Sequence, residues 1–295
     1  REVGKAKGTA ARGRALAEAR DEVEATARAV GEIHRLGRSE GVSKDLAAYD
    51  VKSAREMAAK LRGRLPVDLF TELTERVESL GDAVERSGAP GTMNHGDLHP
   101  GNVLIKSGGV TMIDLENVRF SVDAEGRGVG NPAADGGRFV GAIRINNEVK
   151  GLGLSEGELK EVEDAFVAEY AKESGVPIET LADDLAFYRL RLGMTAILRD
   201  PANTDGYAAE LRKMLAEKRA GAGGALVQGR SPVETRDAGL WERLRSFVAG
   251  TPARDGRAPA EFGPEAEASV KDLRSETRAS LEAEKGRLVR YLRVL

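Results

Sequence analysis

The sequence contains no cysteine among its 295 residues. It can therefore form no disulfide framework, no thiolate nucleophile and no cysteine-based zinc site, which leaves histidine, carboxylate and hydroxyl groups for any chemistry. It also lacks an apolar run of the ~18–20 residues that span a bilayer, so we expect a soluble protein with no membrane partner. Because a cysteine-free chain that begins at Arg1 could have lost an N-terminal signal, the compartment stays open, and we expect the cytoplasm.

An excess of charge of one sign is also missing. Lys and Arg number 45 and Asp and Glu 48, giving a net charge of −3. This balance argues against a protein that coats nucleic acid. The length suits one large domain or two small ones. We expect a helical lobe over residues 1–220 and a helical C-terminal extension over residues 221–295, joined through Gly- and Pro-rich sequence.

Apolar residues recur at helical spacing through most of the chain. They predict three helices before residue 90, the third beginning at Pro66 and ending at Gly88. Further helices are expected from about Pro132, from Ser155 to Gly175, from 177 to 198 and from 206 to 220. A short helix around Trp241 and a charged helix from about 265 to the end would follow. The third helix has the clearest apolar stripe, made of Leu69, Leu73, Val77, Leu80 and Val84.

One β-hairpin interrupts these helices. Residues 102–105 and 110–115 are β-prone runs, and Lys106-Ser107-Gly108-Gly109 between them has the composition of a hairpin turn. We therefore expect a mainly α fold with a single small hairpin.

The residues with chemical potential gather around that hairpin. The segment from His95 to Ile105 reads HGDLHPGNVLI, and MIDLE follows at residues 112–116. Loops supported by a rigid hairpin commonly present catalytic side chains. Asp97, Asn102 and Asp114 supply two carboxylates and an amide oxygen, which are the hard donors that Mg²⁺ favours together with phosphate oxygens.

This arrangement resembles the aminoglycoside phosphotransferase and choline kinase superfamily. An Asp, an Asn five residues later, a short hairpin and a second Asp form the catalytic and metal-binding loops of kinases. Eukaryotic protein kinases differ, because they carry Arg where Gly96 stands and DFG in place of residues 114–116. Two other segments are similar to the superfamily: Ile33-His34-Arg35-Leu36, and Gly130-Asn131-Pro132-Ala133-Ala134-Asp135, in which Asn131 replaces an Asp. The resemblance covers roughly residues 10–215.

The resemblance implies a kinase-like large lobe that transfers the γ-phosphate of ATP to a hydroxyl of a small polar molecule. Asp97 would be the catalytic base, and Asn102 and Asp114 would hold Mg²⁺ against the nucleotide phosphates. His95 and Asp135 would brace the loop, whereas the roles of His99 and Glu116 stay open. The expected partners are nucleotide and a small hydroxyl substrate, with no nucleic acid; the oligomeric state is not predicted.

The superfamily's small lobe has no counterpart in this sequence, because the 94 residues before His95 read as helices. Either Arg1 is an internal residue of a longer protein, or the chain is a degenerate relative that acts as a catalytically inactive kinase-like binding or interaction module. Because the phosphate contacts of a small lobe are missing, we expect residues 1–295 alone to bind ATP weakly and to turn it over slowly or not at all, and upstream sequence to restore both. The acidic residues Asp183 and Asp184 would attract a cationic substrate or form a solvated helix face.

A metal-hydrolase site is a rival interpretation of the same loop. His95, Asp97 and His99 stand at alternate positions, but a hydrolytic zinc site needs a third suitable protein ligand. His34 is the one further imidazole, and we expect it to be a packed histidine at a helix end.

Overall fold

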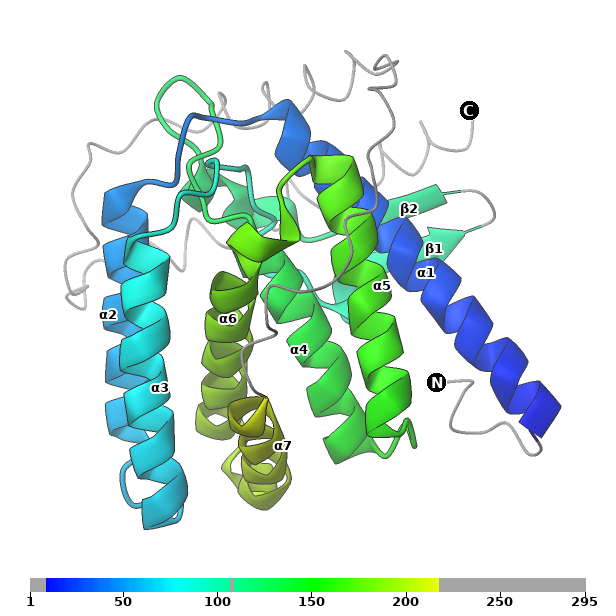
Figure 1. Ribbon diagram of the computed structural model, residues 1–295, viewed down its shortest axis with the longest axis vertical. Helices are drawn as coiled ribbons and strands as arrows, with labels where there is room; N and C mark the ends of the chain where they lie inside the picture. The colour runs from blue at the N-terminus through cyan, green and yellow to red at the C-terminus, as the bar shows by residue number, and fades with distance from the viewer. Residues whose placement is uncertain (1–8, 107–108, 218–295) are drawn as a thin grey trace, which may run out of the picture. The chain divides into compact units, whose positions relative to one another are not determined.

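The computed structural model describes residues 9–106 and 109–217. Three helices precede the hairpin: α1 (Thr9–Leu36), α2 (Lys44–Lys60) and α3 (Val67–Glu85). Four more follow it: α4 (Ala133–Lys150), α5 (Glu156–Ser174), α6 (Ile178–Arg199) and α7 (Thr204–Ala216). Figure 1 shows the hairpin beside this set of helices. The prediction of a mainly α fold with one small hairpin is confirmed for the described residues.

Side-chain caps begin two of these helices. The Ser43 hydroxyl accepts a hydrogen bond from the Leu46 amide at the start of α2. Ser155 and Glu158 form the capping box expected from their spacing, and Gly175 ends α5 in a left-handed conformation. Because caps and glycine stops are local signals, the sequence predicted the ends of α5 closely.

The apolar stripe of α3 is buried along its whole length, as predicted. The helix nevertheless ends at Glu85, before the expected stop at Gly88. The reason lies in tertiary contacts: the Ser87 hydroxyl donates a hydrogen bond to Asp184 on α6 and accepts one from the Ala89 amide. These bonds hold the chain after Arg86 in an irregular, non-helical conformation, so α3 does not continue to Gly88.

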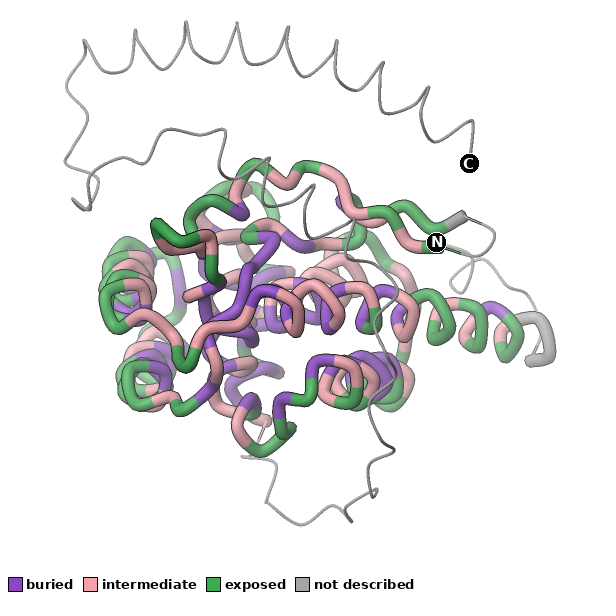
Figure 2. Tube along the Cα trace, turned by 90° about the horizontal axis from the view of Figure 1, so that it is seen from above, coloured by how far each residue is buried: buried purple, intermediate pink, exposed green. Residues whose placement is uncertain are grey.

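The helices pack in neighbouring pairs around a common core. α1 lies along α5, α2 against α3, α4 against α6, and α6 against α7. Aromatic side chains join α4 to α5, where Phe139 and Phe166 stack with ring centroids 5.0 Å apart. Figure 2 shows the buried residues concentrated on the faces that these helices turn toward one another.

The hairpin is shorter than expected at its second strand. Strand β1 (Val103–Lys106) pairs antiparallel with β2 (Gly109–Met112), in a register from Val103 opposite Met112 to Lys106 opposite Gly109. The prediction that the second strand runs to Leu115 was wrong. Asp114 has a φ of +61°, so the chain leaves the extended conformation there and enters the 3₁₀ helix η3 (Leu115–Ser121). A second short 3₁₀ helix, η2 (Pro100–Asn102), precedes β1, and a third, η4 (Pro201–Asn203), precedes α7.

Several expectations fall outside the described residues: the domain boundary at 220/221, the helix around Trp241 and the charged C-terminal helix. α7 begins two residues before its predicted start and ends at Ala216. No helix within the described ranges is both long enough and apolar enough to cross a membrane.

Candidate active site

Asp135, in the first turn of α4, organises the loop before the hairpin. Its buried carboxylate accepts hydrogen bonds from the backbone amides of His95, at 2.6 Å, and Gly96, at 2.9 Å. His34 Nε2 lies 3.1 Å from the same carboxylate. Burial alone would raise the pKa of Asp135, but the hydrogen bonds and the charge interactions with His34 and His95 together lower it. An ionised carboxylate thus ties α1 and α4 to the loop.

His34 is a buried histidine at the end of α1, as expected. Its Nδ1 lies 2.8 Å from the Tyr170 hydroxyl of α5, and its Nε2 faces Asp135. Burial raises the pKa of Tyr170, so the hydroxyl keeps its proton. Both ring nitrogens are therefore engaged in structural bonds.

His95 connects the loop to the end of the hairpin. Its Nε2 donates to the Ile113 carbonyl at 2.8 Å, and its Nδ1 accepts from the Asp97 amide at 3.3 Å. Neither nitrogen is left for a metal, and the same holds for His34. Among the described residues, no group of three or more His, Asp or Glu side chains is arranged to hold a metal ion. These observations oppose the metal-hydrolase interpretation.

Gly96 has a conformation and a packing environment that exclude other residues. Its φ is +78°, and an added Cβ would lie 2.7 Å from the Cβ of Asn117 in η3. The Arg of eukaryotic protein kinases could not occupy this position without moving η3. The glycine therefore lets η3 pack directly against the loop.

Asp97 presents a partly exposed carboxylate. The exposed fraction of its side chain is 36%. Arg138 on α4 donates a hydrogen bond to Asp97 Oδ1 at 2.5 Å, and His99 Nε2 lies 4.0 Å from Oδ2. Arg138 was not among the residues predicted from the sequence. The available signal was its position three residues after Asp135, which places both side chains on one face of α4.

Asn102 and Asp114 lie at the same end of the hairpin. The Ile113 amide donates to the Asn102 carbonyl at 3.0 Å, immediately before Asp114. The buried Asn102 side chain donates through Nδ2 to the Asp97 carbonyl at 3.0 Å. This bond fixes the amide so that its Oδ1 can serve as a ligand. Asp114 is exposed, so the two side chains offer a hard-oxygen donor set suited to Mg²⁺.

Asp184 does not form a solvated helix face, contrary to one expectation for it, and it is not available to attract a cationic substrate. Its side chain is buried and accepts hydrogen bonds of 2.7 Å from Asn131 Nδ2 and from the Ser87 hydroxyl. Burial raises its pKa. Asn131 also accepts a hydrogen bond from the Ala133 amide through Oδ1. The amide of Asn131 thus joins the start of α4 to α6. This contact gives a structural reason for Asn at a position where the superfamily has Asp.

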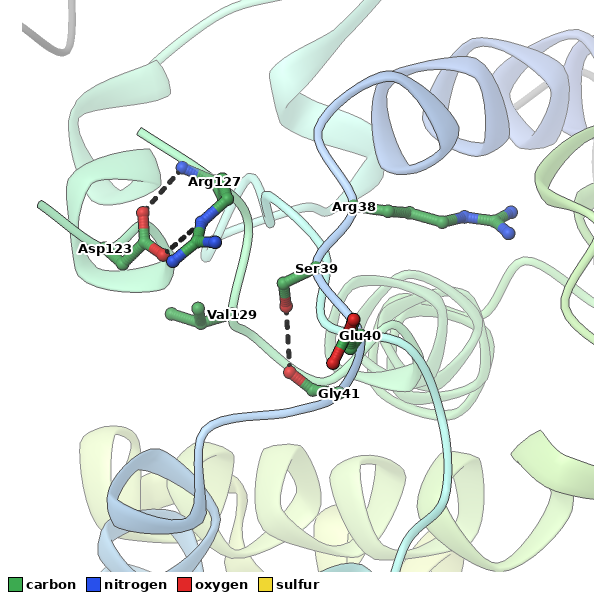
Figure 3. Close-up of a pocket in the computed structure, with 7 residues that line it drawn as sticks. All are labelled: Arg38, Ser39, Glu40, Gly41, Asp123, Arg127 and Val129. Carbon is green, nitrogen blue, oxygen red and sulfur yellow. Dashed lines mark hydrogen bonds and ion pairs between the residues drawn. The ribbon is translucent and has the colours of Figure 1, made fainter. Parts of the chain in front are cut away.

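A pocket of about 560 Å³ lies apart from this loop, between the segment after α1 and the segment after η3. Figure 3 shows the Arg38 guanidinium directed away from the ion pair of Asp123 and Arg127, whose closest atoms are 2.8 Å apart. None of the predicted catalytic or metal-binding residues lines the pocket. The lining residues are Arg38, Ser39, Glu40, Gly41, Asp123, Arg127 and Val129.

Comparison with known families relates this site to a group of enzymes. Residues 5–122 match the Phosphotransferase enzyme family. The matched stretch contains α1 through η3 and includes Asp97, Asn102 and Asp114, so the resemblance found from the motif is confirmed. No curated protein sequence matches the chain significantly.

Among solved structures, the chain is similar to glucosamine kinases. One, crystal form A, has a TM-score of 0.50 and 19% identity, with 69% of this chain and 52% of that chain covered. Crystal form B has a TM-score of 0.49 and 18% identity, with 68% of this chain and 53% of that chain covered. A glucosamine kinase in complex with glucosamine, ADP and inorganic phosphate has a TM-score of 0.48 and 18% identity, with 68% of this chain and 51% of that chain covered. The chain thus spans about half the length of these kinases. The match to crystal form A supports the kinase-like fold.

Proposed function

We propose that the chain carries the catalytic loop of an ATP-dependent phosphotransferase with a small polar hydroxyl compound as acceptor. The main support is the geometry of the loop before the hairpin. Asp135 holds the backbone of this loop, and Asn102 binds the carbonyl of Asp97 at the end of the hairpin where Asp114 also lies. The match to the Phosphotransferase enzyme family supports this assignment.

In the proposed reaction, Asp97 accepts the proton of the acceptor hydroxyl. The hydroxyl oxygen forms a bond to the γ-phosphorus while the bond from that phosphorus to the β–γ bridging oxygen breaks, releasing ADP. Phosphoryl transfer needs positioning and electrostatic stabilisation more than covalent participation by the protein. Asn102 Oδ1 and the Asp114 carboxylate would hold Mg²⁺, which neutralises phosphate charge when bound.

The test is ATP consumption with Mg²⁺ across a panel of aminoglycosides, amino alcohols and sugars. Glucosamine belongs in the panel because glucosamine kinases share the fold. Both residues 1–295 and the longest natural form of the protein are assayed.

Asp97→Asn keeps the volume of the side chain and removes the base, so turnover should fall by at least about 100-fold. Asp164→Asn is the matched control, because Asp164 is an exposed carboxylate on α5 paired with Lys160. Near wild-type turnover by Asp97→Asn would refute the role of base. Nucleotide binding by the longest natural form without turnover of any acceptor would instead support the inactive binding module.

A further inference from the structure

The bond between Arg138 and Asp97 brings a second charged side chain to the proposed catalytic base. Arg138 Nη1 lies 2.5 Å from Asp97 Oδ1, and the exposed fraction of the Arg138 side chain is 30%. Both groups are therefore reachable from solvent, and the pair is not a buried structural bridge.

Helix α4 holds the catalytic loop at two successive points. Asp135 binds the backbone amides of His95 and Gly96, and Arg138 binds the side chain of the next residue, Asp97. Residues three apart on an α-helix lie on the same face. The loop backbone and the carboxylate are thus fixed relative to the same helix.

That helix is itself tightly packed. An added Cβ at Gly137 would lie 2.8 Å from the Cβ of Tyr188, so the backbones of α4 and α6 are in close contact. Phe139, next to Arg138, is buried against Phe166. A side chain anchored on α4 therefore has a well-defined origin, which is the condition for placing a catalytic group accurately.

The contact also distinguishes the two oxygens of Asp97. Oδ1 is engaged by the guanidinium, whereas Oδ2 lies 4.0 Å from His99 Nε2, beyond hydrogen-bond distance. We propose that Arg138 is a positioning residue that fixes the Asp97 carboxylate with Oδ2 directed to the acceptor hydroxyl. This inference rests on the proposed function, in which Oδ2 takes the hydroxyl proton.

The first experiment measures steady-state turnover of Arg138→Met and Arg138→Lys. Loss of positioning should lower kcat of Arg138→Met by about 10- to 100-fold. Its KM for ATP should stay within about twofold, because the substitution removes no group assigned to the nucleotide. Arg138→Lys should recover part of the loss, since an ammonium keeps the charge but not the planar geometry. Lys150→Met is the matched control, because Lys150 is an exposed cation at the other end of α4. Unchanged kcat in Arg138→Met would overturn the inference.

The second experiment needs no turnover. In protein labelled with ¹³C at aspartate carboxyls, the Asp97 signal is assigned by its loss in Asp97→Asn. We expect Arg138→Met to shift that signal and to leave the methyl signals of the core unchanged, with Lys150→Met shifting neither. An Asp97 signal that is identical in Arg138→Met and wild type would overturn the inference, because the two side chains would then not interact. A shifted signal, together with no turnover of any acceptor by the longest natural form, would support the contact and count against the proposed function.

Discussion

Asn131 stands where the superfamily has Asp, and its amide keeps the hydrogen bond to the start of α4 while adding one to Asp184. The Asn131 amide donates to Asp184 and accepts from the Ala133 amide. An Asp at position 131 could still accept from Ala133 but would place a second carboxylate against Asp184. Sequence pattern alone marked Asn131 as a departure and could not give the reason, because its partner lies 53 residues away.

Asn131→Asp should therefore lower the free energy of unfolding at pH 7 by about 3 kcal/mol, the cost typical of an unpaired buried charge. Adding Asp184→Asn should restore most of that loss, because the pair again has one carboxylate and one amide. Urea denaturation of the two single variants and the double variant checks this. Additive losses in the double variant would show that the two side chains do not interact.

Asp135 should make the free energy of unfolding decrease at low pH. Its folded-state pKa is lowered, so the folded protein binds its proton less readily than the unfolded chain does. The stabilisation it gives is complete above the unfolded pKa of about 3.9 and is lost as pH falls through the folded pKa. Asp135→Asn should be less stable at neutral pH and should lose less stability than wild type below about pH 4. Thermal unfolding across that range measures both effects, and parallel pH curves would contradict the assignment.

At the scale of secondary structure, the helices were predictable because their signals are local. Capping residues and apolar periodicity identified α3 and α5 closely. The proposed catalytic loop was predicted from the order of its residues, since Asp97, Asn102 and the hairpin follow one another in sequence. The contact of Arg138 with Asp97 was missed because 41 residues separate them and only the packing of α4 brings them together.

Gly96 and Gly126 provide a matched pair for testing how η3 packs on the loop. Both have a positive φ, +78° and +77°, but an added Cβ at Gly126 meets nothing within 4 Å. Gly126→Ala should cost only the backbone strain, about 1–2 kcal/mol. Gly96→Ala should cost more because its methyl group would also collide with Asn117. Thermal unfolding compares the two, and equal losses would exclude a role for the collision.

At the scale of the described helical unit, a buried ion-pair network joins four helices. Arg144 of α4 contacts Glu163 of α5 and Glu210 of α7, and Arg189 of α6 also contacts Glu163. Burial raises the pKa of Glu163 and of Glu210. Charge composition alone could not reveal this network, because charged residues usually lie on the surface.

Arg144→Met should destabilise the protein by about 3 kcal/mol, because the buried carboxylates of Glu163 and Glu210 each lose one cationic partner. The loss should be smaller at acid pH, where those carboxyl groups take up protons and need no cation. Lys160→Met is the control, since its partner Asp164 is exposed and such a surface pair is worth about 0–1 kcal/mol. Urea denaturation at two pH values measures the difference. Equal losses in the two variants would show that burial does not matter here.

Asp114 has a backbone conformation with a consequence for the evolution of this site. It is the one non-glycine residue with positive φ in the described part of the chain. Gly, Asn and Asp adopt this left-handed region most readily, and of these only Asp carries a charge. Substitution by other amino acids is opposed by the backbone, whereas Asn and Gly remain conformationally acceptable. The proposed function therefore predicts Asp at this position in relatives that transfer phosphate, and a drift to Asn or Gly in relatives that do not.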